Sequence, residues 1–253
     1  MSDFKLGFAA VQNSEFYTNG PGKSIMDCSN YPKAIQDHLN AEIDMIQKVL
    51  KKGQYTGVFE IGSAQAENAQ KFVDQGFSYF GIDINADFVQ TAKERLKILS
   101  SHKQKAETVL LDFYQLSAHF LSTHDVNSYI LFLPFNLFGN FSDKVGAIQK
   151  LLSLKQDFVI SFYDISSQAY MARKDYYCAC QFEDLEYHET KNFAHFYSAD
   201  GLDSIAYRID CLEQMICDQK RNPEDAITIE KLSFGAFGKA IYVRFLDDRV
   251  IKS

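Results

Sequence analysis

The sequence of 253 residues has no long apolar run, no CxxC pair and no excess of basic residues. Without a run long enough to cross a bilayer, and without an apolar stretch behind a basic start in residues 1 to 20, we expect a soluble protein that is not exported and has no membrane partner. The five cysteines are an odd number, so they fit neither a disulfide framework nor a zinc knuckle. We therefore expect a reducing, cytoplasmic location and no metal.

Acidic residues outnumber basic ones, 33 to 26, which gives a formal charge of −7 and argues against a nucleic acid as the main partner. Tryptophan is absent, yet the chain has 22 phenylalanines and 14 tyrosines. This share of aromatic rings is higher than a core requires and suggests a pocket with flat apolar walls.

Short apolar runs alternate with amphipathic helical patterns over the first two thirds of the chain, which is typical of a parallel sheet covered on both faces. After a helix that ends at Gly53, strands are predicted at residues 57–62, 78–83, 109–112, 129–133 and 158–162. An aromatic-rich insertion without a clear helix follows. A further helix is predicted through Leu202, Ile205, Ile209, Leu212 and Ile216, and then a hairpin of strands at 227–232 and 240–245.

These elements predict an α/β fold: a Rossmann-like, doubly wound, mainly parallel seven-stranded sheet with a C-terminal antiparallel hairpin. We expect one domain with four parts. They are an N-terminal helical cap (1–53), a ligand-binding core (54–164), the aromatic insertion as a lid (165–200), and the final helix and hairpin (201–253).

The loop after the first predicted strand carries the first chemical signal, because ligands of such sheets bind beyond the carboxyl ends of the strands. A dinucleotide fingerprint requires glycine where this loop has Ala64 and Glu67. The carboxylate of Glu60 would also repel a phosphate. The loop therefore disfavours NAD and suits a ligand that carries positive charge.

The pattern of an acidic residue followed by small residues at alternate positions, here Glu60, Gly62, Ala64 and Ala66, resembles the class I S-adenosylmethionine-dependent methyltransferases. The resemblance implies that Asp83 accepts hydrogen bonds from the ribose, that Asp112 accepts from the adenine amine, and that Phe113 contacts the adenine ring. S-adenosyl-L-methionine is the implied cofactor. The cofactor site predicted in this way comprises Glu60, Gly62, Ser63, Ala64, Asp83, Ile84, Asp112, Phe113, Leu133 and Pro134.

The fourth predicted strand runs into Leu133-Pro134-Phe135-Asn136, beside the expected position of the methyl group. Methyltransferases that modify amino groups of nucleic acids have a polar residue followed by Pro-Pro-aromatic here, so an adenine-type acceptor is not supported. We expect acceptor contacts from Tyr17, Asn136, Tyr163 and Tyr197, and a general base, if one is used, among His188, His195 and Tyr163. The aromatic insertion either covers the acceptor as a lid or forms the core of an added hairpin.

The sequence thus predicts methyl transfer from S-adenosylmethionine to a small-molecule acceptor by in-line displacement. Two alternatives stay open at this point. One is a methyltransferase that acts on a protein or an RNA. The other is a non-catalytic domain that retains the fold, an interpretation prompted by Ala64 and Ala66 in place of glycine. The sequence leaves the acceptor, the methylated atom and the oligomeric state open.

Overall fold

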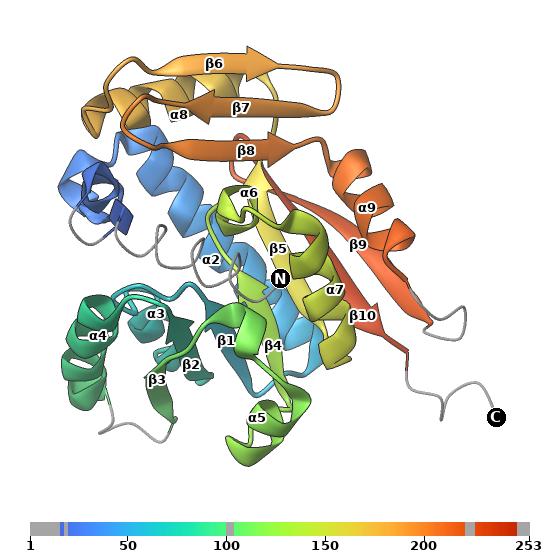
Figure 1. Ribbon diagram of the computed structural model, residues 1–253. Coiled ribbons are helices and arrows are strands. Elements are labelled where there is room, and N and C mark those ends of the chain that lie inside the picture. The colour runs from blue at the N-terminus through green and yellow to red at the C-terminus, as the bar shows by residue number, and fades with distance from the viewer. Residues whose placement is uncertain (1–15, 18–19, 100–103, 221–225, 247–253) are drawn as a thin grey trace, which may run out of the picture.

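The computed structural model describes residues 16–17, 20–99, 104–220 and 226–246. Its main sheet has seven strands in the order β3-β2-β1-β4-β5-β10-β9 (Figure 1). Strands β1 to β5 are parallel, and β10 is antiparallel to both β5 and β9. The predicted fold class is therefore confirmed. The strands are β1 Gly57–Ile61, β2 Ser78–Asp83, β3 Ala106–Leu110, β4 Tyr129–Leu133, β5 Phe158–Tyr163, β9 Ile227–Phe234 and β10 Gly238–Phe245.

Helices cover both faces of this sheet, which explains why β1, β4 and β5 are buried along their whole length. One apolar cluster joins one face of the sheet to helices α2 (Lys33–Gly53), α3 (Ala69–Val73) and α4 (Ala86–Leu99). A second cluster joins the other face to α5 (Ala118–Thr123), α7 (Lys144–Leu154) and α9 (Ile209–Asp218). Short turns complete this part: η1 (Pro21–Met26), η2 (Cys28–Asn30), η3 (Phe113–Gln115) and α6 (Leu137–Asn140).

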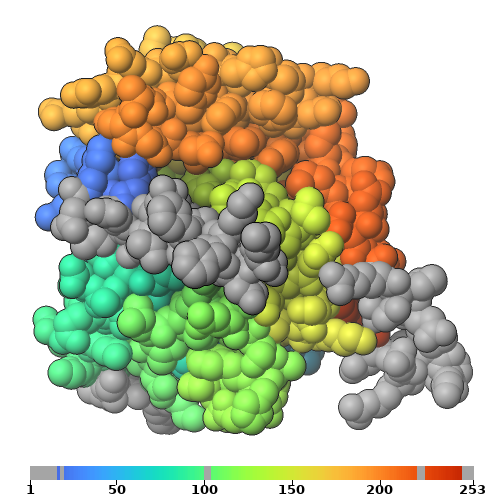
Figure 2. Space-filling view, viewed as in Figure 1, coloured from blue at the N-terminus to red at the C-terminus, as the bar shows by residue number. Residues whose placement is uncertain are grey.

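A small second sheet lies beyond the carboxyl end of β5 (Figure 1). It consists of the antiparallel strands β6 (Glu186–Glu189), β7 (Phe193–Tyr197) and β8 (Asp203–Tyr207), and it follows helix α8 (Ser167–Ala179). Strand β8 contacts β5 and α6, and the second sheet forms a band along one end of the molecule (Figure 2).

Two predictions for this region are wrong. Residues 167 to 179 form helix α8, where the sequence predicted no clear helix. The helix predicted through Leu202 and Ile205 begins only at Ile209, because residues 203 to 207 pair with β7. The spacing of Leu202, Ile205 and Ile209 suits a helical stripe, but pairing with a neighbouring strand determined the structure.

None of the helices in the described ranges combines the length and apolarity that a membrane span requires.

Candidate cofactor and acceptor pocket

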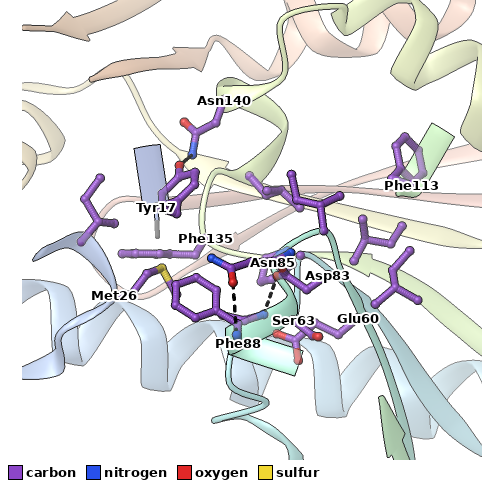
Figure 3. Close-up of a pocket in the computed structure, with 18 of the residues that line it drawn as sticks. Tyr17, Met26, Glu60, Ser63, Asp83, Asn85, Phe88, Phe113, Phe135 and Asn140 are labelled. Atoms are coloured by element: carbon purple, nitrogen blue, oxygen red, sulfur yellow. Dashed lines mark hydrogen bonds between the residues drawn. The ribbon is translucent and has the colours of Figure 1, made fainter. Parts of the chain in front are cut away.

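One pocket lies at the carboxyl ends of β1, β2 and β4. Strand β1 is flanked by β2 on one side and β4 on the other, so the loops that follow β1 and β4 diverge and leave a crevice. Figure 3 shows Phe113 at one end of this pocket, Tyr17, Met26 and Phe135 at the other, and Asp83 between them. The pocket thus joins the predicted cofactor residues to an apolar chamber.

The loop after β1 turns sharply because three of its residues adopt left-handed backbone conformations. Gly62, Ala64 and Ala66 have φ angles of 67°, 44° and 55°. Only glycine enters this region without a steric penalty, which explains the preference for small residues at alternate positions. The turn is held to β2 by the Ser63 amide, which donates to the Ile82 carbonyl at 2.9 Å.

Asp83 ends β2 and connects two loops. Its Oδ2 accepts from the Ala64 amide at 2.8 Å, and its Oδ1 accepts from the Asn85 amide at 2.9 Å. Burial raises the pKa of the carboxyl group, and the backbone hydrogen bonds oppose that shift. Each carboxylate oxygen retains acceptor capacity, so Asp83 fits a ligand with two adjacent hydroxyl groups.

Glu60 lines the same pocket from β1 and is only 2% exposed. Its Oε1 accepts from the Asn68 side-chain amide at 2.8 Å, and its Oε2 accepts from the Tyr79 hydroxyl at 2.6 Å. Burial raises the pKa of Glu60 to about 7, and no described lysine or arginine forms an ion pair with it. A buried carboxylate without a cation suits a positively charged ligand.

The far end of the pocket offers a flat apolar surface beside an acceptor. Asp112 Oδ1 accepts from the Tyr114 amide at 2.9 Å and caps η3. The Phe113 ring stacks on Phe141, with a centroid separation of 5.4 Å. Together with the acidic groups of Glu60 and Asp83, these residues fit S-adenosylmethionine, which has a cationic methionine part, a ribose and an adenine.

The structure brings nearly all predicted cofactor residues together. Leu133 does not line the pocket, because it is fully buried in the core beneath it. The residues of the prediction that do line it are Glu60, Gly62, Ser63, Ala64, Asp83, Ile84, Asp112, Phe113 and Pro134.

The predicted acceptor residues are dispersed. Tyr17 lines the pocket, and its hydroxyl accepts from the Asn140 side-chain amide at 3.4 Å. Tyr163 does not line the pocket but is buried in a cluster with α8 and the second sheet. Asn136 is buried as well, and its side-chain amide donates to the Ile205 carbonyl at 3.1 Å, so it joins the loop after β4 to the second sheet.

His188, His195 and Tyr197 lie on the second sheet, and none of them lines the pocket. His195 pairs with Asp203 across β7 and β8 at 2.7 Å, and the Tyr197 hydroxyl donates to Glu186 at 2.6 Å. No described residue of the insertion at 165–200 lines the pocket. Its aromatic side chains instead form the core between α8 and this sheet, the alternative that the sequence left open.

Apart from Tyr17, the sequence did not single out the residues of the chamber that the N-terminal segment builds. Ile25, Met26, Tyr31 and Leu39 line it together with Phe135. Glu42 of α2 lines it as well and is 1% exposed. The sequence does contain a signal for Glu42, because this acidic residue lies on the mainly apolar stripe of α2, one turn after His38 and one turn before Ile46.

Comparisons with known proteins identify the fold. No protein-family model and no curated protein matches the sequence. Among solved structures, the chain is similar to magnesium protoporphyrin IX methyltransferase (ChlM) from Synechocystis with bound S-adenosylhomocysteine: identity is 13%, the match covers 92% of this chain and 98% of that one, and the TM-score is 0.58.

Two further structures are similar at comparable levels. A SAM-dependent methyltransferase from Aquifex aeolicus has 13% identity, covering 88% of this chain and 97% of that one, with a TM-score of 0.52. The 1,6-didemethyltoxoflavin-N1-methyltransferase from Burkholderia thailandensis has 10% identity and a TM-score of 0.52, and the match covers 82% of this chain and 79% of that one. This chain has the fold of the S-adenosylmethionine-dependent methyltransferases. At these identities the likeness concerns the fold alone, and the activity is inferred from the pocket.

Proposed function

We propose that the protein transfers a methyl group from S-adenosylmethionine to a small-molecule acceptor. The observation that carries the proposal is the meeting of Glu60, Asp83 and Asp112 in one pocket at the carboxyl ends of adjacent strands. In this proposal Glu60 faces the methionine part, Asp83 accepts from the ribose hydroxyls, and Asp112 and Phe113 recognise the adenine.

The bound cofactor supplies an electrophilic methyl group on a positively charged sulfur, which keeps the bonding pair when the acceptor's lone pair forms the new bond. The protein's contribution is to position the acceptor in line with that bond and to exclude water. The apolar side chains of Tyr31, Leu39 and Phe135 create the water-poor wall of the chamber.

Several observations support a small acceptor over a macromolecule. The chamber lies within the pocket, where η1 and η2 of the N-terminal segment bring Ile25, Met26 and Tyr31 over it. The net charge of −7 disfavours RNA. We also propose a reducing, cytoplasmic location, which the five free thiols support.

Isothermal titration with S-adenosylhomocysteine and S-adenosylmethionine tests the cofactor assignment. We expect saturable binding of both compounds at one site per chain. An absence of binding at millimolar ligand would overturn the proposal and leave a domain that keeps the fold without the activity.

A further inference from the structure

The pocket contains a second buried carboxyl group that the proposed cofactor contacts do not use. Glu42 comes from α2, on the opposite side of β1 and β4 from the adenine end, and lines the chamber with Tyr31, Leu39 and Phe135. Because it is 1% exposed, any solvent that stabilises its charge must reach it through the pocket.

The contacts of Glu42 occupy only one of its two oxygens. Oε1 accepts from the Phe135 amide at 2.8 Å and from the Ser161 hydroxyl. No described residue donates a hydrogen bond to Oε2, and no described lysine or arginine forms an ion pair with the carboxyl group. Phe135 follows β4 and Ser161 lies within β5, so the two contacts hold the carboxyl group at the chamber.

A carboxylate that is buried in this way is costly unless a ligand compensates it. Burial raises the pKa of Glu42 to about 7, and Glu42 in turn raises the pKa of Glu60 by charge repulsion. Both carboxyl groups line the same pocket. In the proposed arrangement the ammonium group of the cofactor's methionine part faces Glu60, and Glu42 Oε2 is left without a described donor.

The walls of the chamber indicate what that ligand looks like. The Tyr31 and Phe135 rings contact each other at a tilt of 45° with centroids 6.2 Å apart, and Tyr31 also packs edge-on against Tyr176. Met26 and Tyr17 lie at the same end of the pocket as Phe135 in Figure 3. Such aromatic walls favour a flat apolar body and also favour a positive charge near a ring face.

We infer that Glu42 determines acceptor specificity, and that the acceptor carries an aromatic ring and a protonated amine whose N–H group donates to Glu42 Oε2. The inference rests on the proposed function, because it assumes that the cofactor occupies the remainder of the pocket. It names a binding role for Glu42 and a chemical class for the acceptor.

The test uses two small probes of nearly equal shape, benzylamine and benzyl alcohol, added to the full-length protein saturated with S-adenosylhomocysteine. Ligand-observed NMR measures their dissociation constants. We expect benzylamine to bind about tenfold more tightly than benzyl alcohol, in line with a charge-assisted hydrogen bond. We expect Glu42→Gln to remove this preference and to leave the affinity for S-adenosylhomocysteine within about twofold.

The matched control is Asp44→Asn, which removes a carboxylate from the exposed face of the same helix and should leave the preference unchanged. Equal binding of the two probes to the unaltered protein overturns the inference, and this measurement requires no variant to fold. Weaker S-adenosylhomocysteine binding by Glu42→Gln, with the amine preference retained at a saturating concentration of S-adenosylhomocysteine, assigns Glu42 to the cofactor and also overturns the inference. If the unaltered protein fails to bind S-adenosylhomocysteine, the proposed function itself is wrong.

Discussion

Ala64 occupies a backbone conformation that alanine adopts only at a cost. Its φ angle is 44°, and its amide must donate to Asp83, so the turn cannot relax without losing a contact in the pocket. A left-handed conformation costs a residue with a Cβ roughly 1 to 2 kcal/mol. The loop therefore requires residues that are small and that adopt a positive φ. Alanine is small enough, but it adopts a positive φ only at a cost.

Replacing Ala64 with glycine should stabilise the protein by about 0.5 to 1 kcal/mol, because relief of the φ strain exceeds the entropy that glycine adds to the unfolded chain. Urea unfolding monitored by circular dichroism measures the change. Ala41→Gly, in the middle of α2, is the control and should destabilise by about 1 kcal/mol. Destabilisation by both substitutions would mean that Ala64 is not strained.

Asp83 is the residue whose loss should weaken cofactor binding most directly. Asp83→Ala removes the acceptors proposed for the ribose hydroxyls and also frees the Ala64 and Asn85 amides. We expect the affinity for S-adenosylhomocysteine to fall by about 1 to 3 kcal/mol in isothermal titration. Asp87→Ala, an exposed acidic residue in the first turn of α4, should leave the affinity unchanged. Unaltered binding by Asp83→Ala would place the ribose elsewhere.

At the scale of elements, the sequence predicted the main sheet well because most of its parallel strands are short, apolar and followed by helices. Strand β3 is the exception: it spans Ala106–Leu110 and not the predicted 109–112, because its exposed positions interrupt the apolar run. Strands β2 and β4 begin and end where the apolar runs do. The cofactor end of the pocket followed from that sheet, since its acidic residues end successive strands. The main sheet and the cofactor end of the pocket both follow from patterns of residues that are close together in the sequence.

The acceptor end could not be predicted in the same way, because its parts come from segments that are distant in the sequence. Glu42 on α2 meets Phe135 after β4 and Ser161 on β5 only in the folded chain. His195 was a candidate base by residue type, yet pairing of β7 with β8 directs it to Asp203. Residue chemistry indicates a role only after tertiary pairing has placed the side chain.

The second sheet supports the pocket through a buried arginine on α8. Arg173 is 1% exposed, and its guanidinium donates to the Ser204 carbonyl at 2.7 Å and lies 4.8 Å from the Phe196 ring centroid. Ser204 Oγ in turn accepts from the side-chain amide of Asn136 in the loop after β4 at 3.2 Å. Arg173 therefore ties the second sheet to the pocket loop.

Arg173→Met should preserve the apolar stem but destabilise the protein by about 3 kcal/mol, because buried carbonyl groups lose their charged donor. Denaturant unfolding provides the measurement, and Lys174→Met on the exposed side of the same helix should change stability by less than about 0.5 kcal/mol. Equal effects of the two substitutions would show that the guanidinium contacts contribute little.

For the whole molecule, three buried titratable groups make stability depend on pH in opposite directions. His38 is enclosed by aromatic rings, and no described residue contacts its ring nitrogens through a hydrogen bond, so burial lowers its pKa to about 3. Burial raises the pKa of Glu42 and of Glu60 to about 7. The ordinary values are about 6.5 for histidine and about 4.3 for glutamate.

The sign follows from which state binds more protons. As the pH falls below 6.5, the unfolded chain protonates His38 while the folded chain does not, so the folded state loses stability in acid. As the pH rises from about 4.5 to 7, the unfolded chain releases the glutamate protons that the folded chain retains. The folded state without ligand therefore loses stability in this range, and a bound cation should restore part of it.

Isosteric substitution separates these contributions. Glu42→Gln keeps an acceptor for the Phe135 amide, and its stability relative to the unaltered protein should rise between pH 5 and pH 8. The stability of His38→Phe relative to the unaltered protein should increase as the pH falls from 7 to 4. Urea unfolding at constant ionic strength measures both differences. In thermal unfolding, each kcal/mol corresponds to about 2 to 4 °C in the melting temperature. If the Glu42→Gln difference does not change with pH, Glu42 is ionised as readily in the folded protein as in the unfolded chain, and the pocket must already hold a compensating charge.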